Sequence, residues 1–292
     1  VGICWAKLKP KGPKVRAQPP PATRLRAQVP ASGACLGAPS VMPAKGGGKR
    51  AKGGGKCAEL KIQDAFKAGD IDAVVAEMRA HESIVGVQEE GCAALGKLAM
   101  NDENRTAIAR AGCIEAVLAG MGAHGSIAAV QEQGCRALWI LTLNTDENKT
   151  AIARAGGIGA VVLGMAAHKS IAGVQAQGCV LLGNLALDVE NRTAIARAGG
   201  IEAVVLAMGA HRPIAGMQEE GCWLLSSLSI NDENRAAIAR AGGIEAVVLG
   251  MGEHRSMAGV QEQACAALWN LAASGKNKSA IARAGGIDAV VA

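Results

Sequence analysis

Histidine and cysteine are the residues whose types and spacing first suggest chemistry in this chain. All five His and five of the nine Cys recur in one phase, about 43 residues apart. The two sets are His81, His124, His168, His211 and His254, and Cys92, Cys135, Cys179, Cys222 and Cys265. Zinc requires three or four ligands converging at about 2.0–2.3 Å, whereas each unit supplies one His and one Cys. We therefore expect no metal and no cofactor.

Catalytic chemistry is not indicated either. No nucleophile, base and orienting acid can be assembled without using residues that recur in every unit. The protein is therefore not expected to be an enzyme. The repeated Cys suit small buried positions, and several unpaired thiols indicate a reducing compartment. We expect an intracellular protein of the cytoplasm or nucleus, with an organelle such as the plastid as the alternative.

The charges divide the chain into a basic tail and an acidic body. Residues 1–57 carry 12 Lys and Arg and no Asp or Glu, whereas the remainder carries 19 basic and 25 acidic residues. Eight of the nine Pro also precede residue 44, so an extended tail over 1–57 is predicted. Its charge is consistent with an acidic surface or RNA as a partner, and the alternative is a solvated tail without a partner. The tail residues expected to make this contact are Lys45, Lys49, Arg50, Lys52 and Lys56.

Both ends of the chain leave alternatives open. Met42 is an alternative natural start, so residues 1–41 need not belong to the mature protein. The last unit stops inside an apolar helix at Ala292, which is typical of a fragment. The longest uncharged apolar run, Ala155–Ala167, is shorter than the roughly 18 residues expected of a transmembrane helix.

Residues 58–292 are built from repeats. The segment Ala-Ile-Ala-Arg-Ala-Gly begins at 107, 151, 194, 237 and 280, and a fixed period of this size predicts a solenoid. In each unit, Asp, Glu and Asn start a short first helix that Gly closes, an apolar second helix follows, and a third helix contains the repeated Cys. Five units have a third helix, near 87–100, 130–143, 174–187, 217–230 and 260–273, and a sixth is truncated.

These units resemble armadillo repeats. The matching pattern is Glu-Asn-Arg-x-x-Ile-x-x-Ala-Gly-x-Ile-x-x-Val, followed by Val-Gln-Glu-x-x-Cys-x-x-Leu-Trp-Asn-Leu-Ala at 260–272. The family includes importin-α and β-catenin, to which the chain is distantly similar. The resemblance implies an all-α, armadillo-type right-handed α-solenoid whose third helices line a concave groove for extended peptides. The basic, Pro/Gly-rich tail lies outside this fold.

In importin-α-like members, a Trp four residues before an Asn recurs along the groove. The resemblance implies that the Asn holds the peptide backbone and the Trp flanks basic side chains. The equivalent pairs here are Ala93 and Lys97, Arg136 and Ile140, Val180 and Asn184, Trp223 and Ser227, and Ala266 and Asn270. Two Asn and one Trp match, never in one unit, so general peptide or protein recognition is expected. Trp139 and Trp269 lie one residue before the ladder position, where packing and binding are equally consistent.

Specificity should lie where the repeats differ. The residues expected to face the ligand, with Trp223 as the main anchor, are Lys97, Arg136, Ile140, Asn184, Trp223, Ser227 and Asn270. A further column, one turn earlier on the same face, contains Glu89, Glu132, Ala176, Glu219 and Glu262. An acidic stripe would favour a basic ligand, and the alternative is a solvated glutamate face.

Two functions follow from these features. The first is a non-enzymatic scaffold or adaptor that binds an extended, basic segment of a protein partner in the groove, which the chain's own tail could also occupy. The alternative is an accessory structural subunit of a large assembly, anchored by its tail to RNA or an acidic surface. Binding to phosphates would weaken steeply with salt, and this separates the two hypotheses.

Overall fold

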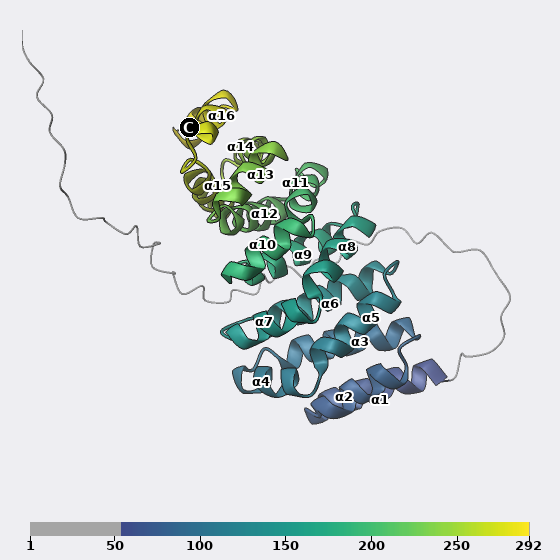
Figure 1. Cartoon of the computed structure of the whole chain (residues 1–292). Helices are drawn as coiled ribbons and strands as arrows, with labels where there is room; N and C mark the ends of the chain where they lie inside the picture. Colours follow the sequence, from purple (N-terminus) through teal and green to yellow (C-terminus); the bar gives the residue numbers. More distant parts are fainter. Residues whose placement is uncertain (1–53, 292) are drawn as a thin grey trace, which may run out of the picture. The chain divides into compact units, whose positions relative to one another are not determined.

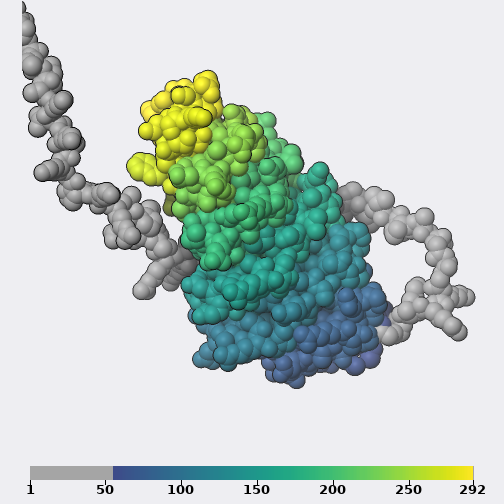
Figure 2. Space-filling view, in the orientation of Figure 1, coloured from purple at the N-terminus to yellow at the C-terminus, as the bar shows by residue number. Residues whose placement is uncertain are grey.

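The computed structural model describes residues 54–291, which form 17 helices and no strand (Figure 1). Successive repeats follow one another as adjacent bands in the space-filling view (Figure 2). The first helices are α4 (Asp102–Arg110), α7 (Asp146–Arg154), α10 (Val189–Arg197), α13 (Asp232–Arg240) and α16 (Gly275–Arg283). The second helices are α2 (Ile71–Ala80), α5 (Cys113–Ala123), α8 (Gly157–Ala167), α11 (Gly200–Ala210), α14 (Gly243–Glu253) and α17 (Gly286–Val291).

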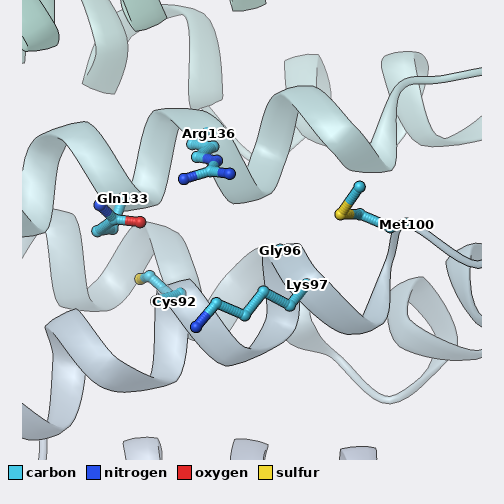
Figure 3. A pocket seen from close by; sticks show the side chains of 7 residues that line it. Cys92, Gly96, Lys97, Met100, Gln133 and Arg136 are labelled. Atoms are coloured by element: carbon cyan, nitrogen blue, oxygen red, sulfur yellow. The ribbon is translucent and has the colours of Figure 1, made fainter. Parts of the chain in front are cut away.

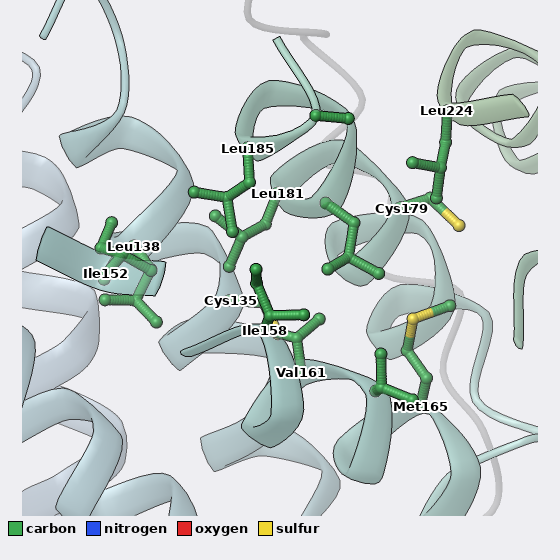
Figure 4. Packing of buried hydrophobic residues seen from close by; sticks show 14 of the residues in the cluster. Cys135, Leu138, Ile152, Ile158, Val161, Met165, Cys179, Leu181, Leu185 and Leu224 are labelled. Atoms are coloured by element: carbon green, nitrogen blue, oxygen red, sulfur yellow. The ribbon is translucent and has the colours of Figure 1, made fainter. Parts of the chain in front are cut away.

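The third helices form a continuous row in which each packs against the next. They are α3 (Val85–Leu98), α6 (Ala128–Leu141), α9 (Ala172–Leu185), α12 (Ala215–Leu228) and α15 (Ala258–Leu271). Aliphatic side chains and four of the five repeated Cys fill the space between neighbouring units, as Cys135, Leu138 and Leu181 do in Figure 4. The fifth, Cys265, is exposed. Stacked repeats thus share one core, without an aromatic centre.

A capping side chain starts three of the five first helices, α4, α10 and α13, and a left-handed glycine follows the end of all five. In α10, the Asp188 carboxylate accepts hydrogen bonds from the backbone N–H groups of Glu190 and Asn191, at 2.9 and 3.0 Å, as an N-cap residue does. At the other end, Gly199 adopts a left-handed φ of 86°, which Gly reaches without strain. The chain turns there by 71° into α11.

The repeated His and Gln join neighbouring elements of the stack. In the unit formed by α4, α5 and α6, His124 is the C-cap of α5, and its Nε2 lies 2.7 Å from the Glu82 carbonyl oxygen of the preceding repeat. A carbonyl oxygen only accepts, so this nitrogen carries the proton. Gln131 donates to the carbonyl oxygens of Met121 and His124, at 2.8 and 3.1 Å. His168, His211 and His254 make the equivalent contact to the preceding repeat.

The N-terminal boundary of the repeats differs from the predicted one. Helix α1 (Gly54–Ala68) begins inside the expected tail of residues 1–57, so Lys56 is an exposed residue of its first turn. Helix α1 packs on α3 as a preceding third helix would. Ile62 and Ala58 anchor it in the core. The other tail residues, Lys45, Lys49, Arg50 and Lys52, and the proposed contact between tail and groove lie outside the described residues.

No single helix between residues 54 and 291 combines the length and apolar composition needed to cross a membrane. Three bent pairs of a first and a second helix meet the criterion of length and composition when each pair is taken together.

Candidate partner-binding surface

The side chains that the third helices leave uncovered form one candidate surface, which we call the third-helix face. Each third helix contributes from the positions three residues before, one residue after and five residues after its repeated Cys. We define this face by Glu89, Ala93, Lys97, Glu132, Arg136, Ala176, Val180, Asn184, Glu219, Trp223, Glu262, Ala266 and Asn270. All of them retain some exposure, so this surface is open to a partner.

Two residues predicted to face a ligand are packed inside instead. Ile140 is only 5% exposed, because its side chain lies against α3 near Gly96. Ser227 is 6% exposed, and its hydroxyl donates to the Trp223 carbonyl oxygen at 3.0 Å within the same helix. Ile140 therefore packs between third helices and Ser227 is buried within α12, which corrects the prediction that they contact a partner.

Both ladder asparagines use their amide nitrogen within the chain. Asn184 Nδ2 donates to the Val180 carbonyl oxygen at 3.0 Å, one turn earlier in α9. Asn270 Nδ2 donates at 3.2 Å to both the carbonyl oxygen and the hydroxyl of Ser226 in the preceding third helix. Each side chain is half-buried. A partner backbone that accepted from either amide would have to replace one of these bonds.

Trp223, the predicted anchor, packs mainly across a joint between repeats. It is half-buried, and its ring occupies the space above Gly183 of α9. Trp269 of α15, for which the sequence left packing and binding open, is 82% exposed. Of its equivalents, Gly96, Gly183 and Ser226 contact the following third helix, and Trp139 packs against the hydrophobic core. No third helix follows α15 in the described chain. The exposure of a Trp at this position thus depends on the repeat that packs beside it. The sequence of a single unit does not show whether such a repeat covers it.

The glutamate column has a role at the helix starts. The Glu132 carboxylate lies beside Gly173 in the first turn of α9, so that a Cβ there would stand 2.2 Å from Oε2. Glu219 lies in the same way beside Gly259 of α15. A carboxylate at a helix N-terminus is stabilised by the helix dipole. Where the column has Ala176, the corresponding Gly216 has no atom within 4 Å. Glu89 is half-buried in the same column, and Glu262 is exposed.

A small pocket opens on this face between α3 and α6 (Figure 3). Its charged residues are Lys97 and Arg136, both among the predicted ligand-facing residues, and Gln133 and Met100 complete its rim. The Lys97 Nζ atom also lies 5.5 Å from the centre of the Phe66 ring in α1, which favours a fixed position for its charge. The structure thus brings together two predicted residues that are 39 positions apart in the sequence.

Burial raises the pKa of several groups in the third helices. Burial, with a smaller effect of the Glu219 charge, raises the pKa of Glu220 to about 7. Burial likewise raises the pKa of the Cys92, Cys135 and Cys222 thiols to about 12. Such thiols are poor nucleophiles, because the thiolate is the reactive form. Within residues 54–291, no group of His, Cys, Asp and Glu is arranged to hold a metal ion.

Repeat period, helix order and packing together define an armadillo-like repeat fold, and solved structures confirm this prediction. The chain is similar to an engineered protein at 28% identity and a TM-score of 0.66, over 75% of this chain and 87% of that one. It also resembles a designed armadillo repeat protein in complex with the peptide (KR)4, at 19% identity and a TM-score of 0.60, over 74% and 89% of the two chains.

A natural protein shares the fold as well. The armadillo repeats only protein from Plasmodium falciparum aligns at 16% identity and a TM-score of 0.59, over 73% of this chain and 97% of that one. No protein-family model and no curated protein sequence matches the chain. The likeness is therefore one of three-dimensional structure, and it establishes the fold.

Proposed function

We propose that this protein is a non-enzymatic binding scaffold that holds an extended segment of a protein partner along the third-helix face. The observation that carries the proposal is the continuous row of third helices whose half-exposed residues differ from repeat to repeat. Residues shared by all repeats form the core, caps and joints, so the variable ones remain free to contact a partner. A designed protein of the same fold binds an alternating basic peptide, (KR)4.

The partner is a polypeptide segment rather than a small molecule. The pocket between α3 and α6 has a volume of only about 20 Å³, far below the roughly 300–1,000 Å³ of ligand-binding clefts. The face instead offers shallow contacts spread over five helices. Such a surface suits an extended chain that makes a few contacts in each repeat. Scaffolding also agrees with the inert character of the buried thiols and with His residues that serve the stack.

Selection from a library of random linear peptides, with the full chain as the target, tests this function. Peptides that bind should lose affinity for a chain with Val180→Glu on the third-helix face. A chain with Leu163→Glu is the matched control, because Leu163 is exposed on α8 and lies outside this face. The proposal fails if no peptide is selected, or if Leu163→Glu weakens binding while Val180→Glu does not.

A further inference from the structure

A pocket lies between α3 and α6. At the equivalent place between α9 and α12, the Trp223 ring fills the space. Gly96 and Gly183 occupy equivalent positions, four residues after Cys92 and Cys179. The Trp223 ring lies above Gly183. The position of Trp223 is taken by Arg136 at the other joint, where Gly96 remains part of an open pocket. The pocket thus results from the pairing of Gly96 with an arginine instead of a tryptophan.

The charge around this pocket is positive. Lys97 and Arg136 are among its lining residues, and no carboxylate is. Neither cation forms an ion pair with any Asp or Glu of residues 54–291. Glu132 lies one helical turn before Arg136, but its carboxylate is placed at the start of α9. The Lys97 ammonium lies beside the Phe66 ring of α1, and the Arg136 guanidinium lines the pocket. Two cations at one pocket without a counter-charge favour an anion from outside.

The size and lining of the pocket define which anion fits. Space of about 20 Å³ holds one small group, because a single water needs roughly 10–15 Å³ on the same measure. Its walls are the small residues Cys92, Ala93 and Gly96. The guanidinium of Arg136 can donate two parallel hydrogen bonds to a carboxylate, and Lys97 adds a point charge. Gln133 supplies an amide donor at the rim.

We propose that this pocket binds the side-chain carboxylate of an Asp or Glu in the partner segment. The inference rests on the proposed function, since an extended segment must pass over the α3–α6 joint. The inference places one acidic residue in the partner segment, at the α3–α6 joint. The glutamate column alone would have predicted a basic segment throughout. The carboxylates of Glu132 and Glu219 lie at the starts of α9 and α15. They therefore repel an acidic side chain beside Arg136 less than the spacing of the glutamates along the sequence suggests.

Peptide selection on the full chain also tests this inference. Selected peptides should share an Asp or Glu at one fixed position. Its replacement by Asn or Gln should weaken binding about tenfold or more, since a hydrogen bond to a charged group is lost. For the double variant Lys97→Gln with Arg136→Gln, acidic and amide peptides should bind alike. Arg197→Gln with Lys278→Gln removes the same charge from exposed positions elsewhere and should keep the preference.

A second variant protects the test against misfolding. Arg136→Trp recreates the arrangement of Trp223 above Gly183, so it should fold, fill the pocket and abolish the acidic preference. Selected peptides without a shared acid, or a preference that survives in Arg136→Trp, would overturn the inference and leave the proposed function intact. If no peptide is selected, the proposed function fails, and the pocket is tested directly by NMR. N-acetyl-aspartate methylamide should then shift the Gly96 amide signal more than its asparagine analogue does, and equal shifts would overturn the inference.

Discussion

The Trp223 ring lies so close to Gly183 that a Cβ added to this glycine would stand 2.3 Å from the ring. Two repeats therefore meet through an aromatic ring and a residue without a side chain. The contact fixes the ring in the joint between α9 and α12, which leaves only part of the indole for a partner. Trp223 thus packs between two repeats with one part of its ring and leaves the other part for contact with a partner.

Substitution of Gly183 by Ala should destabilise the protein by about 1–3 kcal/mol, because the added methyl group overpacks the joint. Urea unfolding measures this change. Gly216→Ala in α12 is the control: a Cβ added at Gly216 would meet no atom within 4 Å, so this variant should be more stable by about 0.5–1 kcal/mol through helix propensity. Equal effects at the two glycines would show that the ring does not restrict Gly183.

Ala176→Glu should stabilise the protein, because it supplies α12 with the carboxylate that Glu132 supplies to α9. The expected gain is about 0.3–1 kcal/mol at low salt, and it should shrink as salt screens the charge. Thermal unfolding at two salt concentrations measures it. Glu262→Gln, at an exposed position of the same column, should leave stability nearly unchanged. A loss of stability in Ala176→Glu would contradict this role of the column.

Glu220 should make stability depend on pH. Its pKa in the folded protein, about 7, lies above the ordinary value of 4.5, so the fold favours the protonated form. The contribution is fully present below about pH 4.5 and is lost as the pH rises through 7. Glu220 lies two residues before Cys222, where the equivalent residues of other repeats include Gln133 and Gln177. Glu220→Gln should therefore raise the free energy of unfolding at pH 8 by about 1–3 kcal/mol. Urea unfolding curves at pH 5 and pH 8 measure the effect. If the free energy of unfolding changes between these two pH values as much in the variant as in the original chain, Glu220 does not cause the dependence.

The thiols should divide into two classes of reactivity. Among the described residues, Cys57 and Cys265 are exposed, whereas Cys92, Cys113, Cys135, Cys179 and Cys222 are buried. Pulse labelling with N-ethylmaleimide at pH 8, followed by peptide mapping, should modify the first two quickly and the other five only on unfolding. Because burial raises the folded pKa above 9.0, stability should also fall as the pH rises from about 9 towards 12. Fast labelling of Cys135 in the folded chain would contradict the packing.

The sequence predicted the repeat architecture, because each period contains its own caps, turn glycine and apolar positions. It could not predict exposure on the third helices, which depends on the repeat stacked alongside. Ile140 is covered by α3, while Trp269 is exposed because no described third helix covers it. The pocket was hidden for the same reason, since it requires Gly96 in one unit and Arg136 in the next. Lys56 was assigned to the tail because its Gly-Lys context hides the start of α1.

The most direct test of the account is a crystal structure of the full chain with its tightest selected peptide. The account predicts an extended peptide that crosses α3, α6, α9 and α12 on the third-helix face, with an acidic side chain at Lys97 and Arg136. A peptide bound instead to the second helices, over the exposed Leu163, Leu206 and Leu249, would contradict it.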